Sequence, residues 1–232
     1  MKEINVKGVI ISNEQKEVYD WYEIDSTCPY DVLSQLSPHE DVKVIINSGG
    51  GSVFAGAEIY TALKSHTGKV IVEVHSLAGS SASIIMMGGS EVHISPVAQV
   101  MIHNVSMGSQ GDYHDMEQAA EILKNANESL ANAYVLKTGI TKNEVLAMMD
   151  KETWLSADKA VELGFADKVM FQDEQKQFNP LALTASINSG LLPQQAINKF
   201  TEIKNEQKQA ELKAEQDKHM LMLNLLKLKE IH

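Results

Sequence analysis

The sequence predicts a layered α/β fold, in which strands alternate with helices. Three observations indicate it. Short β-branched runs alternate with helical patterns, glycine and small residues stand at the turns between them, and 44% of the residues are hydrophobic, as in an ordinary globular protein. The chain of 232 residues is long enough for one domain with a substantial core.

Five segments read as strands, because their apolar residues are β-branched and nearly continuous, as in strands buried on both faces. They are residues 4–11, 42–46, 70–74, 91–94 and 100–103. Three further segments fit helices, at 54–65, 83–88 and 112–138. In the longest, apolar residues recur at spacings of three and four until Gly139, a residue type that often ends helices.

The periodic pattern is interrupted between residues 180 and 193, which contain two prolines and a glycine. We therefore predict a main domain at 1–179, a linker at 180–193 and a helical C-terminal arm at 194–232. The net charge of −11 is carried by the residues before the arm. The arm either packs on its own or a neighbouring subunit, or binds a partner as a coiled arm.

Composition argues against several classes of protein. The negative charge disfavours nucleic-acid binding. All 20 basic residues are lysine, so no guanidinium group is present to form bidentate hydrogen bonds with a phosphate. No apolar run is long enough to cross a membrane, and the first residues lack the features of an export signal. A single cysteine, Cys28, cannot form an internal disulfide. We expect a cytoplasmic protein.

Two glycine-rich stretches precede helices, INSGGGSVFAG at 46–56 and SLAGSSAS at 76–83. The first lacks the lysine of a phosphate-binding loop, and the second has a serine where the hydrolase motif GxSxG needs its last glycine. Neither GxGxxG nor HExxH occurs, and no metal or organic cofactor is implied. Glycine next to a helix start leaves backbone N–H groups open to a substrate carbonyl, which suits an oxyanion hole.

His103 is the candidate base, because it ends the apolar stretch VMIH and is followed by polar, glycine-containing sequence. A serine hydroxyl becomes a useful nucleophile only beside such a base. By spacing alone, however, a histidine at a strand end is more often structural, and serines after glycine are more often turn formers or helix caps. The residues by themselves leave both interpretations open.

Four motifs follow one another along the chain: IINSGGGSVFAGAEIY, GSSAS, VMIHN and ETWLSADKAVELGFAD. Together they resemble the Clp protease proteolytic subunit family over residues 3–171, and most closely its phage and prophage branch, which is associated with capsid maturation. The resemblance implies the superhelix of stacked strand-strand-helix units that this family shares with the crotonases. It also implies a long handle helix, which starts here at Asp112.

The resemblance implies a serine endopeptidase with roles for particular residues. The family's Gly-x-x-Ala-Ser motif, matched to residues 79–83, makes Ser83 the nucleophile, and its Met-Ile-His motif makes His103 the general base. The glycine motif at 47–53 places the backbone amide of Gly51 in the oxyanion hole. The amide of the residue after the nucleophile, Ile84, is the second donor.

The acid of the triad is implied less directly. Counting back from Trp154, Glu152 stands where the family has aspartate, and its extra methylene requires a shifted backbone. Asp150, two residues earlier, is the second candidate. Both carboxylates are equally compatible with a solvated loop.

The resemblance also implies partners: peptide or protein substrates, and copies of the same chain in rings such as a double heptamer. ATP dependence would come from a separate AAA+ unfoldase, and phage capsid or scaffold proteins are the alternative partners. Two other functions stay open. One is a crotonase-type acyl-CoA enzyme, against which the serine and histidine motifs and the lack of arginine argue. The other is a catalytically weak scaffold subunit of a phage prohead.

Overall fold

The computed structural model describes residues 1–172, 198–199, 204–205, 208–209 and 213. The chain divides into one unit at Met1–Glu174 and a second at Gln175–His232. The expected linker at 180–193 lies outside the described residues, and so does most of the expected arm, whose described residues are helical. The division into domain, linker and arm therefore stays a prediction.

The first unit has the predicted α/β fold, and all five expected strands and three expected helices are present in it. The strands are β1 (Lys2–Ile10), β2 (Ser26–Thr27), β3 (Val42–Gly51), β4 (Val70–Gly79), β5 (Glu91–Ile94), β6 (Gln99–Ile102), β7 (Thr153–Ser156) and β8 (Lys168–Val169). The helices are η1 (Asn13–Gln15), α1 (Lys16–Trp21), α2 (Pro29–Leu33), α3 (Val53–Ser65), α4 (Ser81–Met86), α5 (Tyr113–Thr138), α6 (Lys142–Asp150) and α7 (Ala157–Glu162).

The strands form one sheet that forks at β4. Along the order β2-β1-β3-β4-β5-β8, every neighbouring pair is parallel. The first half of β4 pairs with β5, while its second half pairs with β6, with Gly79 opposite Met101. Strand β7 is antiparallel to β6. Since parallel strands end at the same edge of a sheet, the residues that follow β4 and β6 lie side by side.

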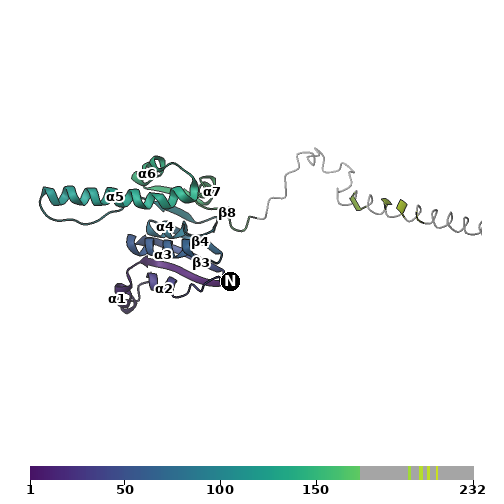
Figure 1. Cartoon of the computed structure of the whole chain (residues 1–232), viewed down its shortest axis with the longest axis horizontal. Coiled ribbons are helices and arrows are strands. Elements are labelled where there is room, and N and C mark those ends of the chain that lie inside the picture. Colours follow the sequence, from purple (N-terminus) through teal and green to yellow (C-terminus); the bar gives the residue numbers. More distant parts are fainter. Residues whose placement is uncertain (173–197, 200–203, 206–207, 210–212, 214–232) are drawn as a thin grey trace, which may run out of the picture. The chain divides into compact units, whose positions relative to one another are not determined.

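The sheet is buried as its sequence predicts. Side chains of β3 alternate between buried and accessible positions, and Val44 and Ile46 are fully buried. Helices α2, α3 and α4 pack next to one another, and α4 also contacts β3 and β4 (Figure 1). This packing fixes α4 directly behind the edge at which β4 ends.

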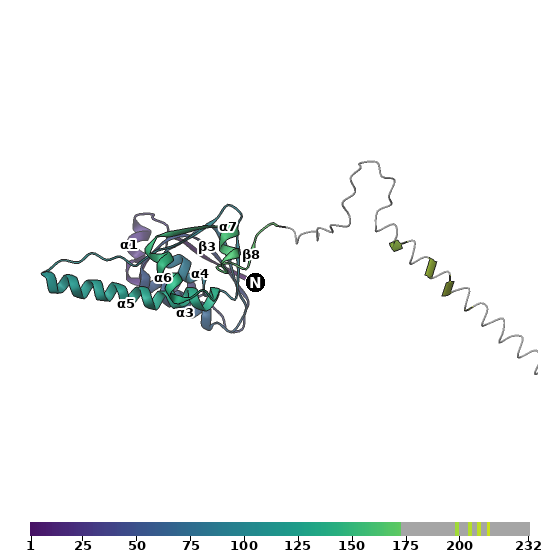
Figure 2. The same ribbon diagram turned by 90° about the horizontal axis from the view of Figure 1, so that it is seen from above.

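Helix α5 is the long helix expected from the sequence. Asp112 caps its N-terminus with a carboxylate that accepts hydrogen bonds from the backbone of His114 and Asp115, and Gly139 caps its C-terminus in the left-handed region, with φ 74°. Its N-terminal half projects from the unit beside the loop that leads into it (Figures 1 and 2). Its C-terminal half packs on α4 and α6, so this helix links an exposed surface to the centre of the unit.

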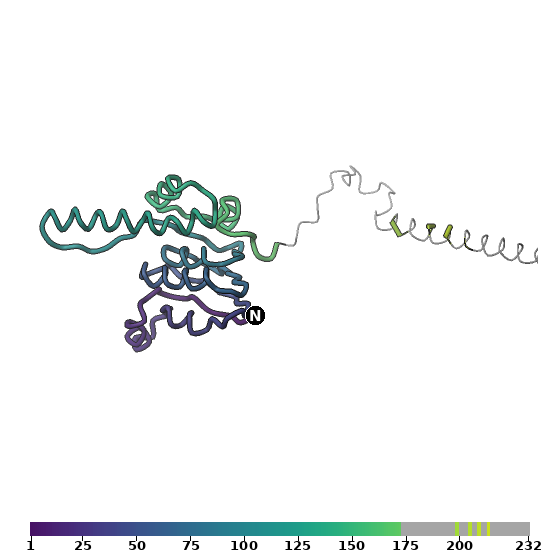
Figure 3. Tube along the Cα trace, in the orientation of Figure 1, coloured from purple at the N-terminus to yellow at the C-terminus, as the bar shows by residue number. Residues whose placement is uncertain are grey.

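Helix α4 begins at Ser81, two residues before the predicted start at residue 83. Figure 3 shows the trace of the unit in the orientation of Figure 1, with α5 and the loop that leads into it standing clear of the other segments. The earlier start leaves Ser80 at the turn and places Ser83 inside the helix. None of the helices in the described part of the chain is both long and apolar enough to cross a membrane.

Candidate active site

Ser80 occupies a sharp turn between β4 and α4. Its backbone has φ 52° and ψ −124°, a conformation that is unfavourable for a residue with a side chain. The N–H of Ser80 donates to the carbonyl of Met101 at 2.9 Å, which ties the turn to β6. Strain of this kind is retained where a side chain must be presented in one direction, as at the nucleophile elbow of hydrolases.

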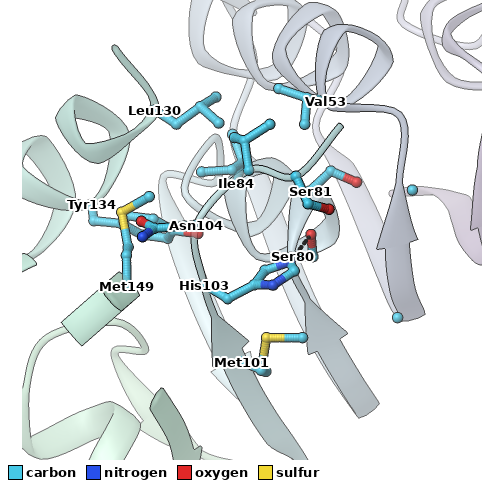
Figure 4. A pocket seen from close by; sticks show the side chains of 14 residues that line it. Val53, Ser80, Ser81, Ile84, Met101, His103, Asn104, Leu130, Tyr134 and Met149 are labelled. Carbon is cyan, nitrogen blue, oxygen red and sulfur yellow. Dashed lines mark hydrogen bonds between the residues drawn. The ribbon is translucent and has the colours of Figure 1, made fainter. Parts of the chain in front are cut away.

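His103 lies directly against Ser80. The Nε2 of His103 is 2.8 Å from the Oγ of Ser80, and the two side chains face each other in Figure 4. The sheet explains the pair, because Ser80 follows the last residue of β4 and His103 follows the last residue of β6, and these strands are parallel neighbours. A serine hydroxyl bonded to a neutral imidazole is the arrangement that activates serine as a nucleophile.

Glycines let the backbone of β3 approach this turn closely. A Cβ on Gly50 would lie 2.7 Å from the Cβ of Ser80 and 3.0 Å from the backbone nitrogen of Ser81, and Gly50 has φ 101°. Gly51, with φ 148°, has no room for a side chain against the backbone of Ile10. The side of the Ser80–Ser81 peptide that faces β3 is therefore free of side chains.

A pocket of about 220 Å³ opens beside the Ser80–His103 pair. Its apolar lining, shown in Figure 4, includes residues of α3, α4, α5 and α6: Val53, Ile84, Leu130, Tyr134 and Met149. Its polar lining includes Ser81, Asn104 and the backbone of Gly49 and Gly51. The pocket can hold an apolar side chain next to the hydroxyl of Ser80 and to the backbone of Gly49 and Gly51.

A comparison with known protein families identifies the origin of this arrangement. The family model described as Clp protease matches residues 26–173, which include the Ser80 turn, His103 and both candidate acids. The chain belongs to the Clp protease family. The fold expected from the resemblance is thereby confirmed.

Curated members of the Clp protease family match this chain at about 30% identity. An ATP-dependent Clp protease proteolytic subunit of Bacteroides fragilis is 31% identical over 142 residues, which cover 60% of this chain and 69% of the relative. The corresponding subunit of Bacteroides thetaiotaomicron is 30% identical over 142 residues, covering 60% and 64%. Proteolytic subunit 2 of Tropheryma whipplei is 27% identical over 140 residues, covering 60% and 78%. The chain thus spans about two thirds of the length of the first two.

The structure does not bring Ser83 and His103 together, and that expectation was wrong. Ser83 is fully buried within α4. Its Oγ donates to the carbonyl of Ser80 at 2.6 Å and lies 2.7 Å from the hydroxyl of Tyr134. The physical reason is the early start of α4: Ser83 is about one helical turn beyond the strand end, so the helix carries it away from the edge where His103 lies.

The two expected oxyanion donors, Gly51 and Ile84, differ in their surroundings. Gly51 lines the pocket, and the role of its backbone amide as an oxyanion donor stays a prediction. The N–H of Ile84 is instead directed at the carbonyl of Ser80, at 3.4 Å, as an ordinary helical bond, so it is not free for a substrate. Ser81 is the first residue of α4, and a first helical N–H has no partner within its helix. Ile84 contributes its side chain to the pocket.

The two candidate acids lie near His103, but neither is bonded to it. Strands β6 and β7 pair Ile102 with Thr153, so the next positions, His103 and Glu152, face each other just beyond the ladder. The Oε1 of Glu152 accepts from the indole N–H of Trp154 at 3.2 Å, and Glu152 has a left-handed backbone, with φ 50°. Asp150 accepts from the side chain of Asn104 at 2.6 Å.

One signal in the sequence pointed to Ser80. If β4 is extended to Gly79, Ser80 and His103 become the first residues after two adjacent parallel strands, where functional side chains of such sheets gather. The family motif can be placed there as well, at residues 76–80, with Ser76 in place of its glycine and Gly79 in place of its alanine. The match that kept the glycine at residue 79 placed the serine of the motif three positions further along, at Ser83.

Proposed function

We propose that this chain is a serine endopeptidase of the Clp type, with Ser80 as its nucleophile and His103 as its general base. The observation that carries the proposal is the 2.8 Å contact between Ser80 Oγ and His103 Nε2. The strained turn at Ser80 and the adjacent pocket support it. Membership of the Clp protease family supplies the reaction class, peptide-bond hydrolysis.

The proposed acylation step uses groups that meet at the pocket. The Oγ of Ser80 forms a bond to the carbonyl carbon of the substrate as its proton passes to Nε2 of His103. The carbonyl oxygen becomes an oxyanion and accepts hydrogen bonds from the N–H groups of Gly51 and Ser81. Collapse breaks the C–N bond, and His103 returns the proton to the leaving amine. Water then hydrolyses the ester by the same steps.

The acid is proposed to be Glu152, as the sequence favoured, with Asp150 as the alternative. Its support is the register of β6 and β7, which places Glu152 opposite His103. To complete the triad, the carboxylate has to leave the indole of Trp154 and turn to the Nδ1 of His103. The left-handed backbone of Glu152 is a strained feature of the type that gathers at functional sites.

The finer functional inferences rest on the resemblance and on the printed names of the relatives. We infer self-association into closed rings, such as a double heptamer, with the projecting half of α5 as a contact surface. We infer a cytoplasmic location. We also infer a role either in phage capsid maturation, to which the resemblance points, or in partnership with an AAA+ unfoldase, because the relatives are called ATP-dependent. Native mass spectrometry tests the ring: a particle of many subunits supports it, and a monomer contradicts it.

Peptide hydrolysis tests the proposed function. A short fluorogenic peptide with an apolar residue before the scissile bond should be cleaved by the wild-type chain. Ser80→Ala and His103→Ala should reduce cleavage to background, with an unchanged circular dichroism spectrum. Full activity in Ser80→Ala would contradict the assignment of Ser80 as the nucleophile. No cleavage by the wild-type chain would favour the scaffold alternative, whereas acyl-CoA turnover would favour the crotonase alternative.

A further inference from the structure

Ser83 is not hydrogen-bonded to His103, but it connects the carbonyl of Ser80 to the hydroxyl of Tyr134 through a chain of hydrogen bonds. We propose that Ser83 and Tyr134 are positioning residues that hold the Ser80–Ser81 peptide in the orientation required of an oxyanion donor. The inference deepens the proposed function and rests on it. It assigns a role to two side chains whose hydrogen bonds go to neither His103 nor the Oγ of Ser80.

The carbonyl of Ser80 is the centre of this arrangement. It accepts three hydrogen bonds: from the backbone N–H of Ser83 at 2.9 Å, from the backbone N–H of Ile84 at 3.4 Å and from the Oγ of Ser83 at 2.6 Å. The first two are the bonds that any helix start provides. The third is short and comes from a side chain, so the sequence adds it specifically.

The direction of the chain of bonds follows from counting protons. A serine hydroxyl has one proton, and that of Ser83 is donated to the carbonyl of Ser80. The hydroxyl of Tyr134, 2.7 Å away, must therefore donate to the Oγ of Ser83. Burial raises the pKa of the Tyr134 phenol, which keeps the proton available for this bond. Successive hydrogen bonds of this kind polarise and strengthen one another.

Holding this carbonyl also holds the neighbouring N–H. The peptide between Ser80 and Ser81 is planar and trans, so its C=O and N–H point in opposite directions. A carbonyl fixed towards the hydroxyl of Ser83 fixes the N–H of Ser81 on the opposite side. Gly50 keeps that side open, because a Cβ there would come within 3.0 Å of the Ser81 nitrogen.

The strained turn explains why the hydrogen bonds from Ser83 and Tyr134, which together we call the clamp, are needed. The dihedral angles of Ser80 lie in a region that costs of the order of 1–3 kcal/mol, so the peptide would relax without restraints on both sides. The bond from the N–H of Ser80 to Met101 restrains one side. The bonds from Ser83 and Tyr134 restrain the other. Because Tyr134 belongs to α5, the clamp also ties the long helix to the catalytic turn.

Tyr134→Phe is the sharpest test, because it removes only the terminal hydroxyl of a buried ring. We expect kcat per active site to fall about tenfold, less than the roughly 10²–10³-fold cost of losing a whole oxyanion donor. KM should stay within twofold, since the pocket keeps its shape. Ser83→Ala should have the same effect. Tyr60→Phe, the same change at a partly buried tyrosine of α3 outside the pocket, is the matched control and should leave kcat unchanged.

A peptide boronate separates positioning from general structural damage. Its tetrahedral adduct with Ser80 places an oxygen in the oxyanion hole, so its affinity should fall in Tyr134→Phe by the same factor as kcat/KM. Active sites are counted by stoichiometric fluorophosphonate labelling, so misfolded protein does not enter the comparison. Wild-type kcat per labelled site in both variants would overturn the inference, as would a rise in KM that accounts for the whole loss.

The two proposals fail in different ways. If Ser80→Ala retains hydrolysis, the proposed function fails, whatever the Tyr134 variant does. If Ser80→Ala is inactive while Tyr134→Phe and Ser83→Ala match the wild type in kcat and boronate affinity, only the positioning role fails.

Discussion

The side chain of Asn104 donates a hydrogen bond of 2.6 Å to Asp150, and Asn104 is the residue that follows His103. Asp150 is thereby occupied by an amide, while Glu152 faces His103 across the β6–β7 ladder. The two acids thus have different surroundings. Replacing each carboxylate by the corresponding amide, in Glu152→Gln and Asp150→Asn, separates their roles.

We predict that Glu152→Gln lowers kcat far more than Asp150→Asn does. The carboxylate of Glu152 would orient His103 and stabilise its imidazolium, and loss of such a group in a serine triad costs of the order of 10⁴ in kcat. Steady-state kinetics on a short peptide measures both variants. A Glu152→Gln variant as active as the wild type would refute the assignment, and a large loss only in Asp150→Asn would transfer it to Asp150.

Trp154→Phe provides the companion measurement. The indole N–H of Trp154 competes for the carboxylate of Glu152 in this structure. Removing that donor frees the carboxylate for His103, so kcat should stay level or rise. A fall in kcat similar to that of Glu152→Gln would show that the Trp154–Glu152 bond itself supports activity.

Gly50→Ala should damage both stability and activity. The new methyl would lie 2.7 Å from the carbonyl oxygen of Gly79 and from the Cβ of Ser80, at a left-handed backbone position. We expect a loss of about 1–3 kcal/mol in the free energy of unfolding, measured by urea denaturation, and a slower rate of fluorophosphonate labelling. Gly108→Ala is the matched control, because a Cβ there meets open space, and its unfolding free energy should change by less than about 0.5 kcal/mol.

Glu91 should make the unfolding free energy depend on pH in acid. Hydrogen bonds from Lys69, and then from His93, lower the pKa of Glu91 to about 2 from the ordinary 4.5. A carboxyl whose pKa is lowered by folding stabilises the fold above its unfolded pKa, and this contribution disappears as the pH falls from 4.5 to 2.

Glu91→Gln should therefore reduce the unfolding free energy at pH 7, by no more than about 1 kcal/mol because solvent screens these ion pairs. The difference from the wild type should vanish near pH 2. Urea denaturation at a series of pH values measures it, with Glu58→Gln as a control, since Glu58 forms no ion pair in the described part of the chain. A difference that stays constant down to pH 2 would contradict the prediction.

Much of the fold could be predicted from local sequence. Buried β-branched runs identified the strands, and the pattern up to Gly139 identified α5 with nearly its observed bounds. Elements of a few residues, such as α7 and β8, carry too little periodicity to be recognised. The ends of β3 and β4 were placed too early, because their last residues contain no β-branched side chain and are held by pairing with neighbouring strands.

The same limit explains the outcome at the site. His103 was a candidate because it ends an apolar strand and matches the Met-Ile-His motif, and the structure places it beside Ser80. Ser80 and Ser83 both follow small residues, and only the tertiary structure distinguishes the serine at the strand end from the serine one turn into the helix. The hydrogen bond from Tyr134, 51 residues away in the sequence, has no local signature.

Mapping the adduct of a fluorophosphonate by tandem mass spectrometry tests the central claim, that Ser80 is the nucleophile. The account predicts a single adduct on Ser80 in the wild type and in Ser83→Ala, where labelling is slower, and none in Ser80→Ala. An adduct on Ser83, or labelling that persists in Ser80→Ala and disappears in Ser83→Ala, would contradict it.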